Sequence, residues 1–170
     1  ISIPEGDAIR ISKLFLAHDD CEPAGLGARD SLRLEAALCL YGNDIDQSTS
    51  PVEASLGWAM QKRRKEEGGF PGASRIQKEL AEGAAKKLVG IKPEGRAPAR
   101  QGVEVQTPEG DSIGAITSGS FGPTVGGPVA MGYVATEHSA AGTKVNLIIR
   151  GKAQPAEIVA LPFVTQNYKR

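Results

Sequence analysis

The chain has 170 residues, which is enough for one medium-sized domain or two small ones with a mainly aliphatic core. Its 20 acidic and 20 basic residues cancel, so no overall charge attracts it to nucleic acid or to an anionic membrane. No apolar run has the length of a transmembrane helix, and the two cysteines are too few and too far apart for a metal motif. We therefore expect no nucleic-acid, membrane or metal partner.

The N-terminal stretch predicts a strand followed by a helix. Residues 1–3 alternate apolar and polar side chains, as a strand does. The chain opens inside this pattern without a methionine, which favours the interpretation that it is part of a longer protein. Asp7 is placed to cap a helix over residues 8–17, in which Ile11 and Leu14 share one face.

Residues 23–42 form the stretch around which the rest of the chain is organised. Its first half predicts a helix that follows two glycines, carries Arg29 in its first turn and gives way to a turn at Gly42. The free amide groups at the start of a helix and the permanent charge of an arginine suit a ligand with carbonyl, carboxylate or ring-nitrogen acceptors. The alternative is a surface helix whose arginines are solvated and paired with Asp30 and Glu35.

The same stretch supplies apolar side chains and a short acidic loop. We expect a buried stripe made by Leu26, Leu34, Ala37 and Leu38, and a buried, inert thiol at Cys39. Residues 43–46 resemble half of a calcium loop, but the required glycine and terminal glutamate are not in place. We interpret them as loop carboxylates without a metal.

Residues 50–67 predict a well-capped helix followed by a charged helix end. Ser50 and Glu53 have the spacing of a capping box, which predicts a helix over residues 52–60. Trp58 on this helix is either part of the core or an aromatic wall beside a ring-shaped ligand. Residues 62–67 form a run of mixed charge, four cations and then two glutamates, and favour a solvated helix end over a docking site for an acidic partner.

The second half of the chain predicts an antiparallel barrel. Glycines break the chain at residues 68–72, a short helix follows at 75–82, and the glycine-rich loop at 119–127 lacks the features of a phosphate loop. Six short strands within about ninety residues are typical of a small closed or half-closed barrel. The strands are expected at residues 87–92, 102–106, 112–118, 128–135, 143–150 and 156–161.

Five stretches, in one order, span nearly the whole chain: AGLGARDSLRLEAALCLYGNDID, SPVEASLGW, GRAPARQG, IGAITSGSFGPTVGGPVAMGYV, and PAEIVALPFV followed by QNY. Together they resemble the aminomethyltransferase (T-protein) family of the glycine cleavage system. The resemblance implies an α+β fold: part of a ferredoxin-like, folate-binding α/β domain over residues 1–81, and a six-stranded antiparallel β-barrel domain over residues 82–170.

The resemblance also implies a function. Such an enzyme takes an aminomethyl group from the lipoyl arm of the H-protein, releases ammonia and passes the methylene group to tetrahydrofolate. Its compartment is the bacterial cytoplasm, or the mitochondrial matrix in a eukaryote. The alternatives are a folate-dependent demethylase, an iron–sulfur assembly paralogue of the same fold, or a non-catalytic binding module.

By the family pattern, Arg29, Trp58 and Tyr168 contact the folate. Arg33, Glu35 and Tyr41 support the helix and its turn. No catalytic residue falls within the chain, because the family aspartate lies upstream of residue 1, and we therefore expect the chain alone to be inactive. The resemblance implies tetrahydrofolate as the acceptor, no metal, and the lipoylated H-protein as partner.

Overall fold

The computed structural model describes residues 1–167, and its contacts divide the chain into two compact units, residues 1–30 and residues 31 onward. The first unit contains the 3₁₀ turn η1 (Glu5–Asp7), helix α1 (Ala8–Leu16) and the start of helix α2 (Leu26–Glu35). No helix in the described part of the chain is long and apolar enough to cross a membrane.

The prediction for the N-terminal stretch is half right. Helix α1 is confirmed to within one residue of its expected end, but residues 1–3 form no strand. A strand needs a hydrogen-bonded neighbour, and none of the described residues pairs with this segment. Asp7 precedes α1 without capping it, because its carboxylate accepts from the Arg10 guanidinium at 3.0 Å instead.

Helix α2 ends at Glu35, just before the second apolar run of the stretch. The Leu38 amide donates to the Arg33 carbonyl at 2.8 Å and the Ala37 amide to the Leu34 carbonyl at 3.0 Å, which is a Schellman end with Ala37 at a φ of 58°. The expected buried stripe is therefore wrong at two of its four members, since only Leu34 and the half-buried Ala37 pack against the barrel. Leu34 is fully buried, whereas Leu26 and Leu38 are 84% and 48% exposed.

The capping box forms, but the helix that it should start does not. The Ser50 amide donates to Glu53 and the Glu53 amide to the Ser50 hydroxyl, both at 3.1 Å. The chain then leaves the helical path at Ser55, whose φ is 58°, and its hydroxyl donates to the Leu88 carbonyl of the barrel. Only one turn and the 3₁₀ turn η2 (Gly57–Ala59) remain of the helix predicted over residues 52–60.

Two short helices follow: the second agrees with the helix expected at residues 75–82, whereas residues 62–67 form a helix of their own and not the end of the preceding one. They are α3 (Lys62–Glu67) and α4 (Ala73–Glu82), and the glycines between them take left-handed conformations. Helix α3 pairs two of its four cations with its two glutamates one turn away, at 3.8 and 3.5 Å. This pattern agrees with a solvated helix rather than a basic docking site.

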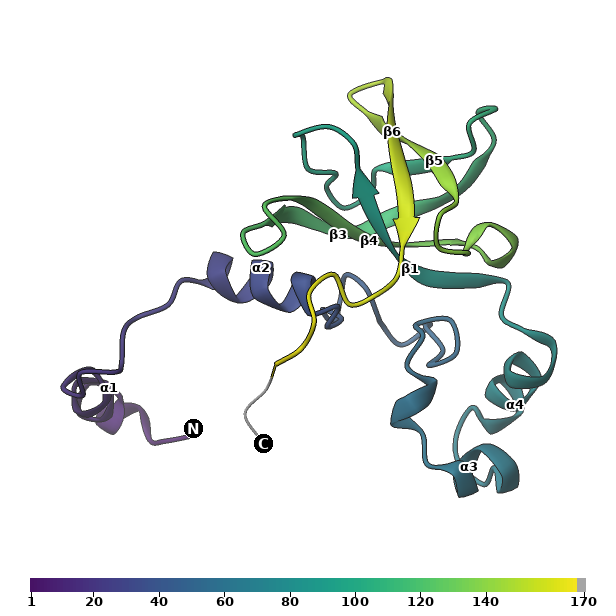
Figure 1. The fold of residues 1–170 in the computed structure, drawn as a ribbon. Helices are drawn as coiled ribbons and strands as arrows, with labels where there is room; N and C mark the ends of the chain where they lie inside the picture. The colour runs from purple at the N-terminus through teal and green to yellow at the C-terminus, as the bar shows by residue number, and fades with distance from the viewer. Residues whose placement is uncertain (168–170) are drawn as a thin grey trace. The chain divides into compact units, whose positions relative to one another are not determined.

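Six antiparallel strands within residues 86–159 close into a barrel with the order β1-β4-β3-β2-β5-β6 (Figure 1). The α+β class and the barrel are thereby confirmed, and closure leaves no free sheet edge. Strand β3 runs further than predicted, so most of the expected glycine-rich loop is a hairpin between β3 and β4. The strands are β1 (Lys86–Pro93), β2 (Glu104–Gln106), β3 (Ser112–Gly122), β4 (Gly127–Ala135), β5 (Lys144–Ile149) and β6 (Lys152–Val159).

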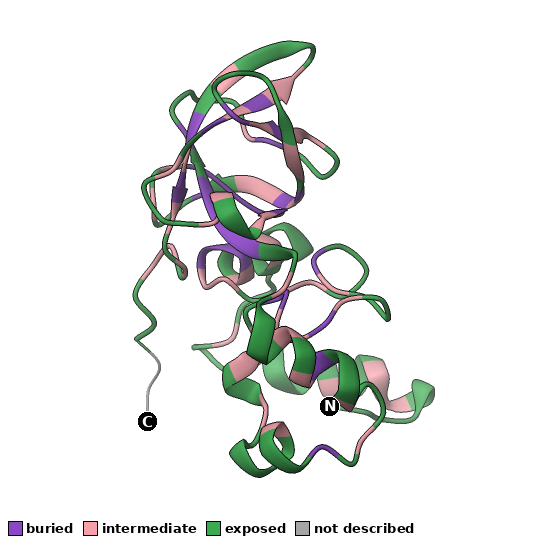
Figure 2. Ribbon diagram, turned by 90° about the vertical axis from the view of Figure 1, so that its right-hand side faces the viewer, coloured by how far each residue is buried: buried purple, intermediate pink, exposed green. Residues whose placement is uncertain are grey.

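Alternating side chains of β1 and β4 build two apolar clusters on opposite faces of the sheet. Val89 and Ala130 belong to the cluster inside the barrel, where most of the buried positions lie (Figure 2). Their neighbours Leu88 and Val129 point the other way and pack with Leu34 of α2. The outer face of the barrel is thus an apolar surface against which the end of helix α2 packs.

Candidate functional site

A buried ion pair joins the end of α2 to the loop that follows it. The Arg33 guanidinium donates to Oδ2 of Asp44 at 2.6 Å, and the two side chains are 10% and 0% exposed. The same oxygen accepts from the Leu40 amide at 2.8 Å. Because two donors converge on one carboxylate oxygen, hydrogen bonds stabilise the negative charge of Asp44 although the side chain is buried away from water.

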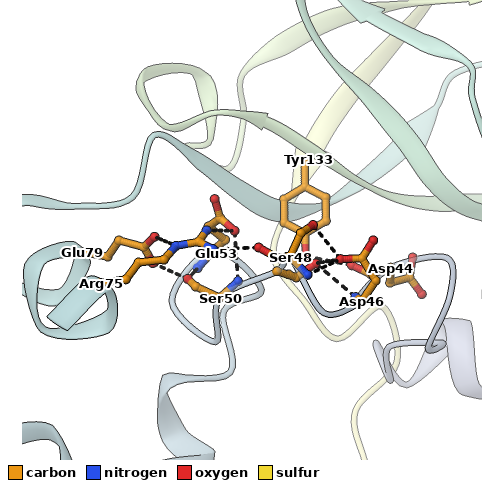
Figure 3. A network of polar contacts seen from close by, with 9 residues as sticks. Asp44, Asp46, Ser48, Ser50, Glu53, Arg75, Glu79 and Tyr133 are labelled. Carbon is orange, nitrogen blue, oxygen red and sulfur yellow. Dashed lines mark hydrogen bonds and ion pairs between the residues drawn. The ribbon is translucent and has the colours of Figure 1, made fainter. Parts of the chain in front are cut away.

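Strands β3 and β4 hold this pair against the barrel. Thr117 donates its hydroxyl to Oδ1 of Asp44 at 2.5 Å, and Arg33 donates to the Ser118 hydroxyl at 2.9 Å. Tyr133 donates to the Asp44 carbonyl oxygen at 2.8 Å (Figure 3). Burial, helped by nearby negative charges including that of Asp44, raises the pKa of Tyr133, so the phenol remains a neutral donor.

Glu35, the last residue of α2, connects the helix to two further segments of the same unit. Its Oε1 accepts from the amides of Thr124 and Val125 in the β3–β4 hairpin, at 2.7 and 2.8 Å. Its carbonyl oxygen accepts from the amides of Phe163 and Val164. The side chain is buried, and its Oε2 has no hydrogen-bond partner among the described residues.

A second polar network ties the capping box to helix α4 (Figure 3). Arg75 forms ion pairs with Glu53 at 2.9 Å and Glu79 at 2.7 Å, and donates to the Ser48 carbonyl at 2.7 Å. Ser50 donates its hydroxyl to the Glu79 carboxylate. Partial burial acts to raise the pKa of Glu79, but the contacts from Ser50 and Arg75 outweigh it and lower the pKa.

Trp58 is a surface residue in the described part of the chain, with 79% of its area exposed. It lines two neighbouring hollows of about 520 and 450 Å³, the first with Val52 and Leu80, the second with Leu56 and Leu161. The core alternative for Trp58 is therefore wrong in this structure. A flat indole between apolar hollows has the character of a wall for a ring-shaped ligand.

The structure does not test whether the other two predicted folate contacts lie together. Arg29 is exposed in the unit of residues 1–30, and Tyr168 lies outside the described residues, so their pairing stays a prediction. Tyr41 is 66% exposed and forms only an isolated bridge to Ile45. Cys39 is half-buried rather than buried, and desolvation, followed by the charge of Asp44, raises the pKa of its thiol.

Sequence reasoning missed the part played by Asp44 and Thr117. The sequence predicts only a loop carboxylate at Asp44, whereas in the structure this side chain is buried against the barrel. Thr117 reaches it because the register of β3 shifts between Ile116 and Ser118, and such a bulge re-aims a side chain. The sequence contains the pair as an arginine eleven residues before an aspartate. This spacing predicts a contact only when the conformation of the intervening turn is known.

The two polar networks hold the end of helix α2, the capping box and helix α4 in place. Among the described residues, no group of three or more histidine, cysteine or acidic side chains could hold a metal ion. The polar contacts described above fix the helix end, the loop and the hairpin, whereas Oε2 of Glu35 has no hydrogen-bond partner among the described residues. The fold and site therefore define an α+β protein in which a closed barrel supports a helix and an exposed aromatic surface.

Comparisons with known proteins identify the family. Residues 1–64 match the model of the GCVT N-terminal domain, and residues 86–165 match that of the glycine cleavage T-protein C-terminal barrel domain. The chain is 50% identical to the mitochondrial aminomethyltransferase of Dictyostelium discoideum over 100% of its own length and 44% of that protein. It is 46% identical to the mitochondrial enzyme of Gallus gallus, over 99% of the chain and 43% of the relative.

A solved structure agrees with the sequence matches. The glycine cleavage system aminomethyltransferase T of Bartonella henselae superposes with a TM-score of 0.93 at 44% identity, covering 99% of this chain and 46% of that one. The chain belongs to the glycine cleavage T-protein family. It spans less than half the length of the relatives that it matches.

Proposed function

We propose that the protein carrying this chain is a tetrahydrofolate-dependent aminomethyltransferase. It takes the aminomethyl group from the lipoyl arm of an H-protein, releases ammonia and passes the methylene group to tetrahydrofolate. The observation that carries this proposal is the agreement with the Bartonella henselae enzyme, at 44% identity and a TM-score of 0.93, along 99% of the chain. Agreement of this extent includes the loops as well as the regular elements, so the proposal does not rest on fold class alone.

The proposed folate contacts are Arg29, Trp58 and Tyr168. The exposed indole of Trp58 between two apolar hollows supports this assignment, because a pterin is a flat ring that needs such a wall. A guanidinium near the start of a helix suits the carboxylates and ring acceptors of a folate. Arg33, Glu35 and Tyr41 act in support, by holding the helix and the turn that follows it.

Two further parts of the proposal concern organisation and compartment. We assign residues 1–81 to the folate-binding α+β domain and residues 82–170 to the barrel domain. The mitochondrial names of the curated relatives support the mitochondrial matrix, with the cytoplasm as the compartment if the source is bacterial. Because the chain spans less than half of those relatives, we expect the 170-residue chain alone to release no ammonia and to bind tetrahydrofolate weakly.

The test measures tetrahydrofolate-dependent ammonia release from aminomethylated H-protein by the protein that carries this chain. Arg29→Ala should raise the KM for tetrahydrofolate by about tenfold or more, since a charged hydrogen bond contributes about 1.5–3 kcal/mol. The matched control is Arg10→Ala, which removes an exposed arginine paired with Asp7 one turn away. No ammonia release by the unmodified protein, or equal KM values for the two variants, would contradict the proposal.

The same assay separates the alternatives from the same fold. Dimethylglycine and sarcosine replace the aminomethylated H-protein, and formaldehyde or methylene-tetrahydrofolate is measured. Demethylation of either amine without ammonia release from the H-protein would make the protein a demethylase. Activity with the H-protein alone supports the aminomethyltransferase.

A further inference from the structure

The barrel contains a cavity that the proposed function does not use. It measures about 640 Å³ and lies between the β1–β2 connection and the β5–β6 hairpin. Residues from both segments line it, and its volume falls in the range of small-molecule sites. The lining residues are Ala97, Pro98, Arg100, Val103, Ile149, Arg150, Lys152 and Gln154.

The lining combines an apolar part with a basic part. Pro98, Val103 and Ile149 are half-buried and supply the apolar surface. Arg100, Arg150 and Lys152 are exposed, and none of the three has an ion pair with a described residue. No acidic side chain among the described residues lines the cavity, whereas Lys144 on the neighbouring strand is paired with glutamates.

The β5–β6 turn gives a second, independent observation. Arg150 and Gly151 both have positive φ angles, 53° and 74°, as in the tight hairpin turns that favour Asn-Gly. An arginine is disfavoured in this conformation because its Cβ crowds the backbone. Uncommon residues in strained turns cluster at binding sites, so the position of Arg150 points to a role outside the turn itself.

From the cavity, its unpaired cations and the strained turn, we propose that this end of the barrel binds a small organic anion. The ligand has a flat or aliphatic body that covers Pro98, Val103 and Ile149. It carries at least two negative charges, as a phosphate monoester or a dicarboxylate does, which face Arg100, Arg150 and Lys152. A concave site of this size fits such a molecule better than it fits the surface of a protein.

The test uses the 170-residue chain labelled with ¹⁵N and two probes, adenosine 5′-monophosphate and naphthalene-1,5-disulfonate. Adenosine serves as the uncharged counterpart and inorganic phosphate as the anion without a body. We expect saturable amide shifts at residues 97–103 and 149–154 with at least one of the two probes, and weaker binding by adenosine and by phosphate. Binding should weaken as salt is added.

Arg150→Asn is the decisive variant. Asparagine suits the turn, so thermal unfolding followed by circular dichroism should show an unchanged or raised midpoint. The affinity for the probe should fall about tenfold or more, because a charge-assisted contact is lost. Lys78→Gln is the matched control, since it removes an exposed cation from α4, and it should bind as the unmodified chain does.

Three results would overturn the proposal. They are the absence of saturable shifts at these residues with both probes, equal affinities of the Arg150→Asn and Lys78→Gln variants, and binding by polyglutamate but by neither probe. The last result would assign the surface to an acidic polypeptide. None of the three results depends on aminomethyl transfer. Failure of this proposal therefore leaves the proposed function intact, and failure of the proposed function leaves this proposal intact.

Discussion

Replacing Asp44 with asparagine tests whether the buried ion pair fastens α2 to the barrel. The carboxylate accepts from Arg33 at 2.6 Å, from the Leu40 amide at 2.8 Å and from Thr117 at 2.5 Å, with no exposed side-chain area. The substituted side chain would keep the volume and one acceptor oxygen. It would place an amide group opposite hydrogen-bond donors and remove the negative charge that faces the Arg33 guanidinium at 2.6 Å.

Breaking a buried pair by removing one member costs about 3–5 kcal/mol, and the retained acceptor offsets a part of this loss. We therefore expect the free energy of unfolding to fall by about 3 kcal/mol. In a unit of this size, 1 kcal/mol corresponds to about 3 °C in the midpoint, so the Tm should fall by about 10 °C. Urea and thermal unfolding, both followed by circular dichroism, measure the two quantities.

The matched control is Asp46→Asn. Asp46 is exposed, and it accepts from Ser48 and Thr49 in its own turn, so its loss should cost less than about 1 kcal/mol. Arg33→Met combined with Asp44→Asn completes a double-mutant cycle. A change below about 1 kcal/mol for Asp44→Asn, or one equal to that of the control, would refute the view that this pair holds the helix end.

Two further predictions concern the barrel and the α4 network. Gly114→Ala places a Cβ 1.9 Å from the Tyr133 carbonyl oxygen and should cost about 3 kcal/mol or more in urea unfolding, whereas Gly127→Ala has open space and should be neutral or slightly stabilising. Because the pKa of Glu79 is lowered in the folded chain, its contribution to stability is present above the ordinary glutamate pKa and is lost as pH falls through the folded value. Glu79→Gln should therefore reduce the fall in the free energy of unfolding at acidic pH, measured by urea unfolding at a series of pH values. An unchanged fall would contradict this.

The barrel could be predicted from the sequence because its signals are local. Each strand is indicated by alternating apolar and polar side chains and by turn residues at its ends. Neither signal depends on what packs against the strand. The pair Leu88 and Val89 shows this plainly, since the two side chains point to opposite faces as the pattern requires. The end of β3 was missed because a glycine-rich segment carries no alternation to follow.

The region before the barrel could not be predicted to the same extent, because tertiary contacts override its local signals. A capping box predicts how a helix starts, but Ser55 and the Leu88 carbonyl decide where the chain leaves it. Likewise, Leu38 fits a helical stripe only if the helix continues past Ala37. Asp44 looks like a loop residue until Thr117, on a strand 73 positions further along the chain, helps to bury it.

The end of α2 offers a test of this reasoning at a single position. Ala37 holds the left-handed place of a Schellman end, which glycine usually fills, and it packs against the cluster around Leu34. Ala37→Gly relieves about 1 kcal/mol of strain, but it loses about as much through a more flexible unfolded chain and a missing methyl group. Its stability should therefore stay within about 1 kcal/mol of the unmodified chain.

Ala37→Val should behave differently. A β-branched side chain is more crowded in the left-handed conformation, so we expect a loss of about 2 kcal/mol or more. If residue 37 did not hold the left-handed conformation, the two variants would be about equally stable in urea. A difference between them supports the turn in which the amides of Ala37 and Leu38 donate to the carbonyls of Leu34 and Arg33, and which leads the chain toward Asp44, the partner of Arg33.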